Sequence, residues 1–211
     1  MRTRLSSPKR RAPRAAGKPA ERLLRTDVAA ARRLIRRLAA NWPLLEGAPI
    51  GVRFRPSLWV SRGRLAKPPS GVEVHAATFV RRRQVMLEAA LLRHPSELAR
   101  ILIHELFHFA WVRLGNARRR SWEQLVAEES RCGARGELGY SAERRKLSLS
   151  RRDLQARTRR WREYVCESFC DSAAWLFTPR SRHEEFTLAI RWRRRRKRWL
   201  KQLMAHGPLP V

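Results

Sequence analysis

The pattern of apolar and polar positions predicts a helix, then a set of short strands, then a mostly helical second half. Residues 21–41 place leucine, isoleucine and valine at helical spacing between arginines and end near Pro43, as an amphipathic helix does. Residues 50–92 change to short apolar or alternating runs separated by glycine and proline, and we expect three to four strands there. Beyond Gly115 the spacing is almost wholly helical. The predicted fold class is therefore α+β, with helix dominant.

The longest apolar segment is predicted to form a buried helix over residues 97–114. Pro95 discourages helix before it, Ser96 can cap its first turn, and Gly115 ends it. Its apolar residues cover a broad surface rather than one narrow stripe, which indicates burial on several sides. We expect this helix to occupy the centre of the domain.

Three polar side chains interrupt the apolar centre of this helix: His104, Glu105 and His108. They are the only polar residues between positions 101 and 110, in a chain of which 31% of the residues are charged. Two histidines four residues apart can hold one Zn²⁺, and the adjacent glutamate can act as general base on the water that the ion activates. The alternative is a pair of core histidines bonded to backbone carbonyls. Burial of these groups without partners would cost several kcal/mol, so the spacing favours a zinc site.

A catalytic zinc ion usually takes a third protein ligand and keeps one position open for water. Glu163, Glu167 and Asp171 recur every four residues on one face of an apolar helix predicted over residues 163–178. Metal coordination, with a hydrogen bond to a ligand histidine, would satisfy such acids. Ion pairs with the arginines that precede them would satisfy them as well. Four further glutamates lie in a more polar stretch: Glu123, Glu128, Glu129 and Glu137.

The His104-Glu105-x-x-His108 helix followed by Glu167-x-x-x-Asp171 resembles the paired active-site helices of the gluzincin superfamily of zinc metallopeptidases. The resemblance implies that Glu167 is the third zinc ligand. It also implies that Asp171, one turn later, orients a ligand histidine. Glu105 would be the general base of peptide-bond hydrolysis.

The resemblance covers roughly residues 50–180, and residues 167–179 are similar to the second active-site helix of ImmA/IrrE-like peptidases. Two departures are a long connection over residues 109–166 and Cys170, which stands where alanine is usual. The implied fold is zincin-like, with a small antiparallel sheet packed on the central helix. By analogy, residues 85–87 would be the edge strand that pairs with extended substrate.

Composition divides the chain into three parts. Residues 1–20 hold seven Lys or Arg, three Pro and no acid, which predicts a disordered basic tail without the apolar core of a secretory signal. A zincin-like domain is predicted over residues 21–180, and a basic C-terminal helix and tail over residues 181–211. No apolar run approaches the roughly 18 residues that span a bilayer.

Three cysteines are too few and too scattered for a disulfide scaffold, which favours a reducing cytoplasm. Cys166 and Cys170 are four residues apart and could ligate a metal, but small buried thiols are the favoured interpretation. A donor for the transition-state oxyanion is also usually needed. The candidates are His183, Tyr140 and Tyr164.

The net charge of +30 adds a second theme. Residues 191–201 place eight Lys or Arg around Trp192 and Trp199. Such a segment attracts nucleic acid or anionic lipid without sequence selectivity, and the tryptophans could stack on unpaired bases. Free use of arginine on solvated helix faces is the alternative.

The leading hypothesis is a cytoplasmic zinc metallopeptidase that acts on a protein or peptide, with non-specific nucleic acid as a further candidate partner. His104, His108 and Glu167 would bind Zn²⁺, Glu105 would be the general base, and Asp171 would orient a ligand. The alternative hypothesis is a nucleic-acid-binding protein whose zincin-like domain is structural or inactive. The sequence does not indicate an oligomeric state.

Overall fold

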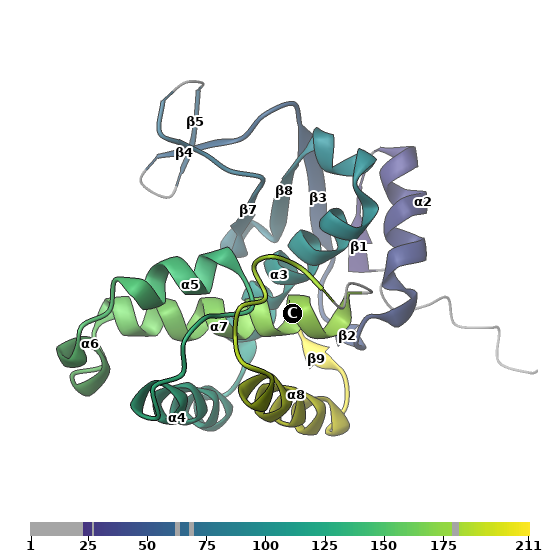
Figure 1. The fold of residues 1–211 in the computed structure, drawn as a ribbon. Coiled ribbons are helices and arrows are strands. Elements are labelled where there is room, and N and C mark those ends of the chain that lie inside the picture. The colour runs from purple at the N-terminus through teal and green to yellow at the C-terminus, as the bar shows by residue number, and fades with distance from the viewer. Residues whose placement is uncertain (1–22, 27, 62–63, 68–69, 179–181) are drawn as a thin grey trace, which may run out of the picture.

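The computed structural model describes residues 23–26, 28–61, 64–67, 70–178 and 182–211 (Figure 1). The predicted basic tail over residues 1–20 lies outside the described residues. The described part is α+β and mostly helical, as predicted. Its helices are α2 (Ala29–Leu38), α3 (Pro95–Arg113), α4 (Asn116–Arg131), α5 (Tyr140–Leu147), α6 (Arg151–Gln155), α7 (Arg159–Phe177) and α8 (Ile190–Ala205). Its strands are β1 (Leu24–Arg25), β2 (Leu45–Glu46), β3 (Ile50–Arg55), β4 (Trp59–Ser61), β5 (Arg64–Ala66), β6 (Val72–Glu73), β7 (Ala76–Phe79), β8 (Gln84–Glu88) and β9 (Leu209–Pro210).

The main sheet has four strands in the order β1-β3-β8-β7. The prediction of an antiparallel sheet is wrong, because β3 runs parallel to both β1 and β8, and only β7 is antiparallel to its neighbour. After β3 the chain leaves through a separate antiparallel sheet of order β5-β4-β6 and returns as the β7–β8 hairpin. In this hairpin β8 lies between β7 and β3 and runs parallel to β3.

The predicted edge strand, residues 85–87, is instead central. Val85, Met86 and Leu87 are all buried in β8, as expected for a strand covered on both faces. The edge strands of this sheet are β1 and β7, and β7 contacts α3. An apolar run of this length is more typical of an interior strand than of an edge, and this explains the error.

The amphipathic helix predicted over residues 21–41 is shorter than expected. Helix α2 covers only Ala29–Leu38 and continues as a 3₁₀ turn to Asn41. Leu24 and Arg25 form β1 and pair with Ile50 and Gly51 of β3. Strand pairing with a distant segment outweighs helical spacing here.

The apolar helix predicted over residues 97–114 is confirmed as α3, with shifted ends. It begins at Pro95, which occupies a first-turn position where its missing N–H costs nothing. Gly115 has an ordinary φ of −59° and precedes α4 instead of capping α3 in a left-handed conformation. Helix α3 packs against the sheet through β7 and against α7 on another side, so it is buried almost all round (Figure 1).

The basic C-terminal segment packs onto the same core as the rest of the chain. Helix α8 contacts α4 and α7, and β9 pairs in parallel with β2. Arg196 of α8 is fully buried and lies between Glu129, 2.7 Å away, and Glu137, 2.6 Å away. The segment therefore differs from the rest of the described residues in charge, but it packs into the same hydrophobic core. None of the described helices combines the length and the apolar composition needed to cross a bilayer.

Candidate metal centre

Helices α3 and α7 bring the predicted zinc ligands together. His104 Nε2 lies 3.2 Å from His108 Nε2 and 3.3 Å from Glu167 Oε2. The third separation, from His108 Nε2 to Glu167 Oε2, is 4.0 Å. Glu167 lies 59 positions after His108, across the long connection, so only the packing of the two helices brings it to the histidines.

The spacing of these three atoms fits a tetrahedral zinc ion. Donors about 2.0–2.1 Å from such an ion are separated from one another by about 3.3 Å. Two of the three separations match this length, and the third is wider. Two imidazoles and one carboxylate are also a common donor set for catalytic zinc. The residues present therefore fit the ion that the motif implies.

Strong electrostatic coupling links the three side chains. Burial lowers the pKa of both histidines, but their neighbours outweigh it: Asp171 and Glu167 raise the pKa of His104 well above its usual value, and Cys166 and Glu167 help to raise that of His108 to about 9. Burial raises the pKa of Glu167, yet the histidines and Arg145 lower it to about 2. Without metal the centre therefore holds protons, which a divalent cation would displace.

Glu105 faces the same space. Its ligand atom and those of His104 and His108 lie within 4.8 Å of one another. The side chain is buried, and its Oε2 accepts a 2.5 Å hydrogen bond from Thr78 Oγ1 of β7. Thr78 thus fixes the candidate base from the edge strand. Nothing in the sequence singles out this threonine among ordinary strand residues.

Asp171 contacts the ring nitrogen of His104 that faces away from the other ligands. His104 Nδ1 donates to Asp171 Oδ1 over 2.7 Å. The other oxygen, Oδ2, accepts from the backbone N–H of Ala142 in α5, 2.9 Å away. Gly139 allows this close approach, because a Cβ there would lie under 3.0 Å from the Asp171 carboxylate. The start of α5 therefore positions Asp171, and Asp171 in turn positions His104.

Arg145, also on α5, contacts the remaining ligand. Its Nη2 lies 3.1 Å from Glu167 Oε1, which leaves Oε2 directed to the histidines. In the sequence Arg145 is one of many arginines in clusters, so no local signal separates it from solvated cations. The connection between the two motif helices thus supplies two supports that the sequence does not reveal.

The competing glutamates lie elsewhere. Glu163 is 45% exposed and pairs with Arg159 over 2.7 Å. Glu123 accepts from Arg157 and from Trp161 Nε1. The other three acids meet cations of α8: Glu128, Glu129 and Glu137. Of the glutamates considered as third ligand, Glu167 is the one placed beside the histidines.

The three oxyanion candidates do not contact the ligands through any interaction found among the described residues. The hydroxyl of Tyr164 is buried and donates to Glu137 Oε1 over 2.6 Å. Tyr140 is largely exposed at the start of α5. His183 Nε2 lies 3.4 Å from Glu97 Oε2.

The two thiols on α7 are close to the centre. Cys170 Sγ lies 3.5 Å and Cys166 Sγ 3.6 Å from Nδ1 of His108. Cys170 is buried and Cys166 half-buried, and both are free. Both thiols are therefore placed against a candidate ligand histidine.

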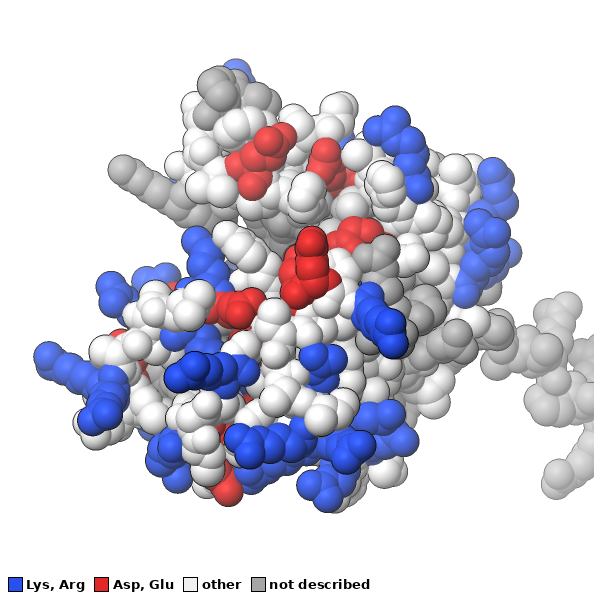
Figure 2. Space-filling model, in the orientation of Figure 1, with Lys and Arg blue, Asp and Glu red and all other residues white. Residues whose placement is uncertain are grey.

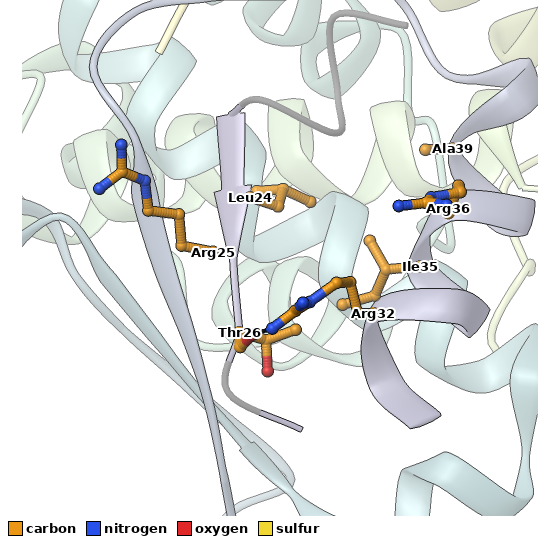
Figure 3. A pocket seen from close by; sticks show the side chains of 7 residues that line it. All are labelled: Leu24, Arg25, Thr26, Arg32, Ile35, Arg36 and Ala39. Carbon is orange, nitrogen blue, oxygen red and sulfur yellow. Dashed lines mark hydrogen bonds between the residues drawn. The ribbon is translucent and has the colours of Figure 1, made fainter. Parts of the chain in front are cut away.

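A separate pocket between β1 and α2 is unrelated to this centre. Figure 3 shows the side chain of Arg32 extending toward β1, where its Nη2 donates to the carbonyl of Thr26 over 3.0 Å. None of the candidate ligands lines this pocket. Its lining residues are Leu24, Arg25, Thr26, Arg32, Ile35, Arg36 and Ala39 (Figure 3).

Searches for related proteins give no guide to the chain. No protein-family model, curated protein or solved structure matches it significantly. The geometry of the centre is therefore what indicates the function of the chain.

Proposed function

We propose that this protein is a zinc-dependent metallopeptidase of gluzincin type. The observation that carries the proposal is the convergence of His104 Nε2, His108 Nε2 and Glu167 Oε2, at 3.2, 3.3 and 4.0 Å, with Glu105 beside them. A structural site would more often use four protein ligands. Three ligands with an adjacent carboxylate favour a hydrolytic role.

Each surrounding side chain has a task in this proposal. When bound, zinc would polarise the scissile carbonyl and lower the pKa of a water molecule. Glu105 takes the proton from that water and passes it to the leaving amine, while Thr78 keeps its carboxylate in place. Asp171 holds the Nδ1 proton of His104, so that the Nε2 lone pair is free for the metal. Arg145 fixes Glu167 through the oxygen that does not face the histidines.

The edge position of β7 supports a peptide as substrate. One side of β7 pairs with β8, and the strand ends the sheet order on the other side. Thr78 of this strand touches the general base. An extended peptide that added to β7 would therefore run past Glu105.

The decisive test compares Glu105→Gln with the unaltered protein. The purified protein should carry about one zinc ion per chain and cleave a quenched-fluorescent unfolded protein. Glu105→Gln should keep the zinc and lose cleavage by about 10²–10⁴-fold, whereas His104→Ala should lose both. Glu163→Gln is the matched control, since it removes an exposed acid from the same helix as Glu167 and should change neither. Equal cleavage by Glu105→Gln, or native protein without zinc, would refute the proposal.

A second candidate function is contact with a polyanion through α8. Five cations line one exposed face of this helix: Arg191, Arg194, Lys197, Arg198 and Lys201. Figure 2 shows Lys and Arg gathered along the lower edge of the molecule, where α8 lies in Figure 1, with acids nearer the middle of the view. The tryptophans do not provide a free stacking platform, because Trp199 packs on Trp122 at 5.0 Å and Trp192 packs against a small buried cluster that includes Phe186. Binding would therefore be electrostatic.

A further inference from the structure

His108 has a candidate metal ligand near each of its ring nitrogens. Nε2 faces His104 and Glu167. Nδ1 faces the sulfurs of Cys166 and Cys170, and these three donor atoms lie within 4.8 Å of one another. The second group is outside the proposed hydrolytic centre and has no task in it.

The register of α7 produces both groups. Glu167 and Asp171 are four residues apart, and so are Cys166 and Cys170, one position earlier. Residues four apart on a helix lie one above the other on the same face. Helix α7 therefore presents a pair of acids to α3 and, beside it, a pair of thiols.

Hydrogen bonding to His108 accounts for only part of this arrangement. A single ring nitrogen takes part in one hydrogen bond as donor or acceptor. Two sulfurs nevertheless lie at nearly equal distances from Nδ1, 3.5 and 3.6 Å. In a tetrahedral site with metal–sulfur bonds of about 2.3 Å and metal–nitrogen bonds of about 2.0–2.1 Å, sulfur and nitrogen are about 3.6 Å apart. One cation between the three atoms would satisfy them all.

We propose that His108 Nδ1, Cys166 Sγ and Cys170 Sγ form a second metal site, which binds a thiophilic cation such as Cu⁺ or Cd²⁺. Two thiolates and an imidazole are the soft donors that such ions prefer over carboxylate and water. Binding forms two metal–sulfur bonds and one metal–nitrogen bond and releases to solvent the protons that the sulfurs and Nδ1 carried before. This site does not depend on peptide hydrolysis, so it stands or falls separately from the proposed function.

The shared histidine couples the two sites. A neutral imidazole that binds metal through Nδ1 carries its proton on Nε2, the atom that faces Glu167. In this state Nε2 offers a hydrogen where the hydrolytic centre needs a lone pair. A thiophilic cation on the sulfur side should therefore weaken zinc binding on the other side, and zinc should weaken the thiophilic cation by the same factor.

The test is a cadmium titration of the metal-free, full-length protein under a thiol-free reductant. Cys132→Ser serves as the background, because Cys132 is exposed and would add an unrelated thiol. In this background we expect one Cd²⁺ per chain, with thiolate-to-cadmium charge transfer in the ultraviolet. Adding Cys166→Ser should weaken binding by about tenfold or more and reduce the band. Cys170→Ser should weaken binding to the same extent. Because Cys170 is fully buried, circular dichroism is used to confirm that this variant is folded.

Variants of the hydrolytic centre separate the two proposals. His104→Ala and Glu167→Gln should keep the cadmium band while losing zinc, and His108→Ala should lose both. Absence of the band in the Cys132→Ser protein, or its persistence when Cys166 and Cys170 are both replaced, would overturn the second site. Loss of the band in folded His104→Ala would overturn it too, since the cadmium bound by the thiolates would then depend on a ligand that the second site does not include. Zinc affinity that is unchanged when the thiol site is filled would overturn the coupling.

Discussion

One group of buried acids packs against α7 and another lies on it, and the two groups differ in what neutralises them. In the first, Glu129 and Glu137 are fully buried and share the guanidinium of Arg196. Tyr164 and Lys146 also donate to Oε1 of Glu137. Fixed cations and donors of the protein thus balance this group, which ties α8 to α4 and α7.

In the second group, Glu167 and Asp171 face two histidines, and one fixed cation contacts this group. Glu167 is 13% exposed and His108 20%, so this group has access to solvent that the Arg196 cluster lacks. Arg145 binds only the oxygen of Glu167 that faces away from the histidines. Buried acids therefore serve a structural role where a buried protein cation pairs with them, and a candidate functional role where two histidines face them.

Arg196→Met should give the largest change in stability. It leaves two buried carboxylates without their cation, and we expect a loss of about 3–5 kcal/mol in the free energy of unfolding. Glu167→Gln should cost the metal-free protein clearly less, because its site is partly exposed. Urea unfolding of both metal-free variants measures the difference. Equal losses would mean that the two groups of acids are not distinct in role.

Gly139→Ala tests how tightly the second group is organised. The added methyl group must displace the Asp171 carboxylate, so zinc affinity should fall by about 10–100-fold, as for Asp171→Asn. Gly115→Ala is the control, because its φ is ordinary and no atom lies within 4 Å of the added Cβ. Competition with a zinc chelator reports both affinities. A Gly139→Ala protein with unchanged affinity would show that α5 does not position the site.

The second group, which contains the histidines, should also respond to pH. The pKa of His104 is raised well above its usual value and that of His108 to about 9, while the pKa of the neighbouring Cys166 thiol is lowered to about 6. On balance the folded metal-free protein therefore binds protons that the unfolded chain releases above the usual histidine pKa near 6.5. The stability that this protonation contributes is complete below pH 6.5 and is lost as pH rises toward 9. Zinc affinity should rise over the same range, by up to about tenfold per pH unit for each displaced proton. Chelator competition and urea unfolding between pH 6.5 and 9 check both trends, and a flat response would contradict the protonated centre.

The smallest expected effect concerns the exposed cations of α8. If they contact a polyanion, the affinity for DNA should fall with salt, and Arg194→Gln should reduce the slope of log affinity against log salt by about one. Arg159→Gln, which removes an exposed cation from α7, is the control. Filter binding over a salt series measures the slopes. An unchanged slope for Arg194→Gln would exclude this face as the contact.

The sequence predicts those parts of the site that depend on local spacing. His104 and His108 share a face because they are four residues apart, and the same holds for Glu167 and Asp171. A buried, apolar α3 also follows from composition alone. The geometry between the two helices does not, because it depends on packing across the long connection.

The features that the sequence misses depend on distant partners. Leu24 pairs as a strand although its spacing is helical, and β8 is interior because the β7 hairpin covers it. Arg196 is buried and Arg145 half-buried beside their acids, yet each lies in a basic run that also holds exposed arginines such as Arg194 and Arg144. Residue type does not distinguish these two arginines from their neighbours. What distinguishes them is the acid that each one contacts in the fold.

The involvement of α5 affects how other chains of this kind would be recognised. A search built on the two motif helices alone would accept a sequence with a shortened connection, because every residue of the pattern would still be present. Such a chain would lack the backbone N–H of Ala142 and the guanidinium of Arg145, and its aspartate and glutamate would be free to turn to other rotamers. Gly139 and Arg145, at their distances before the second helix, are therefore the positions to add to that pattern.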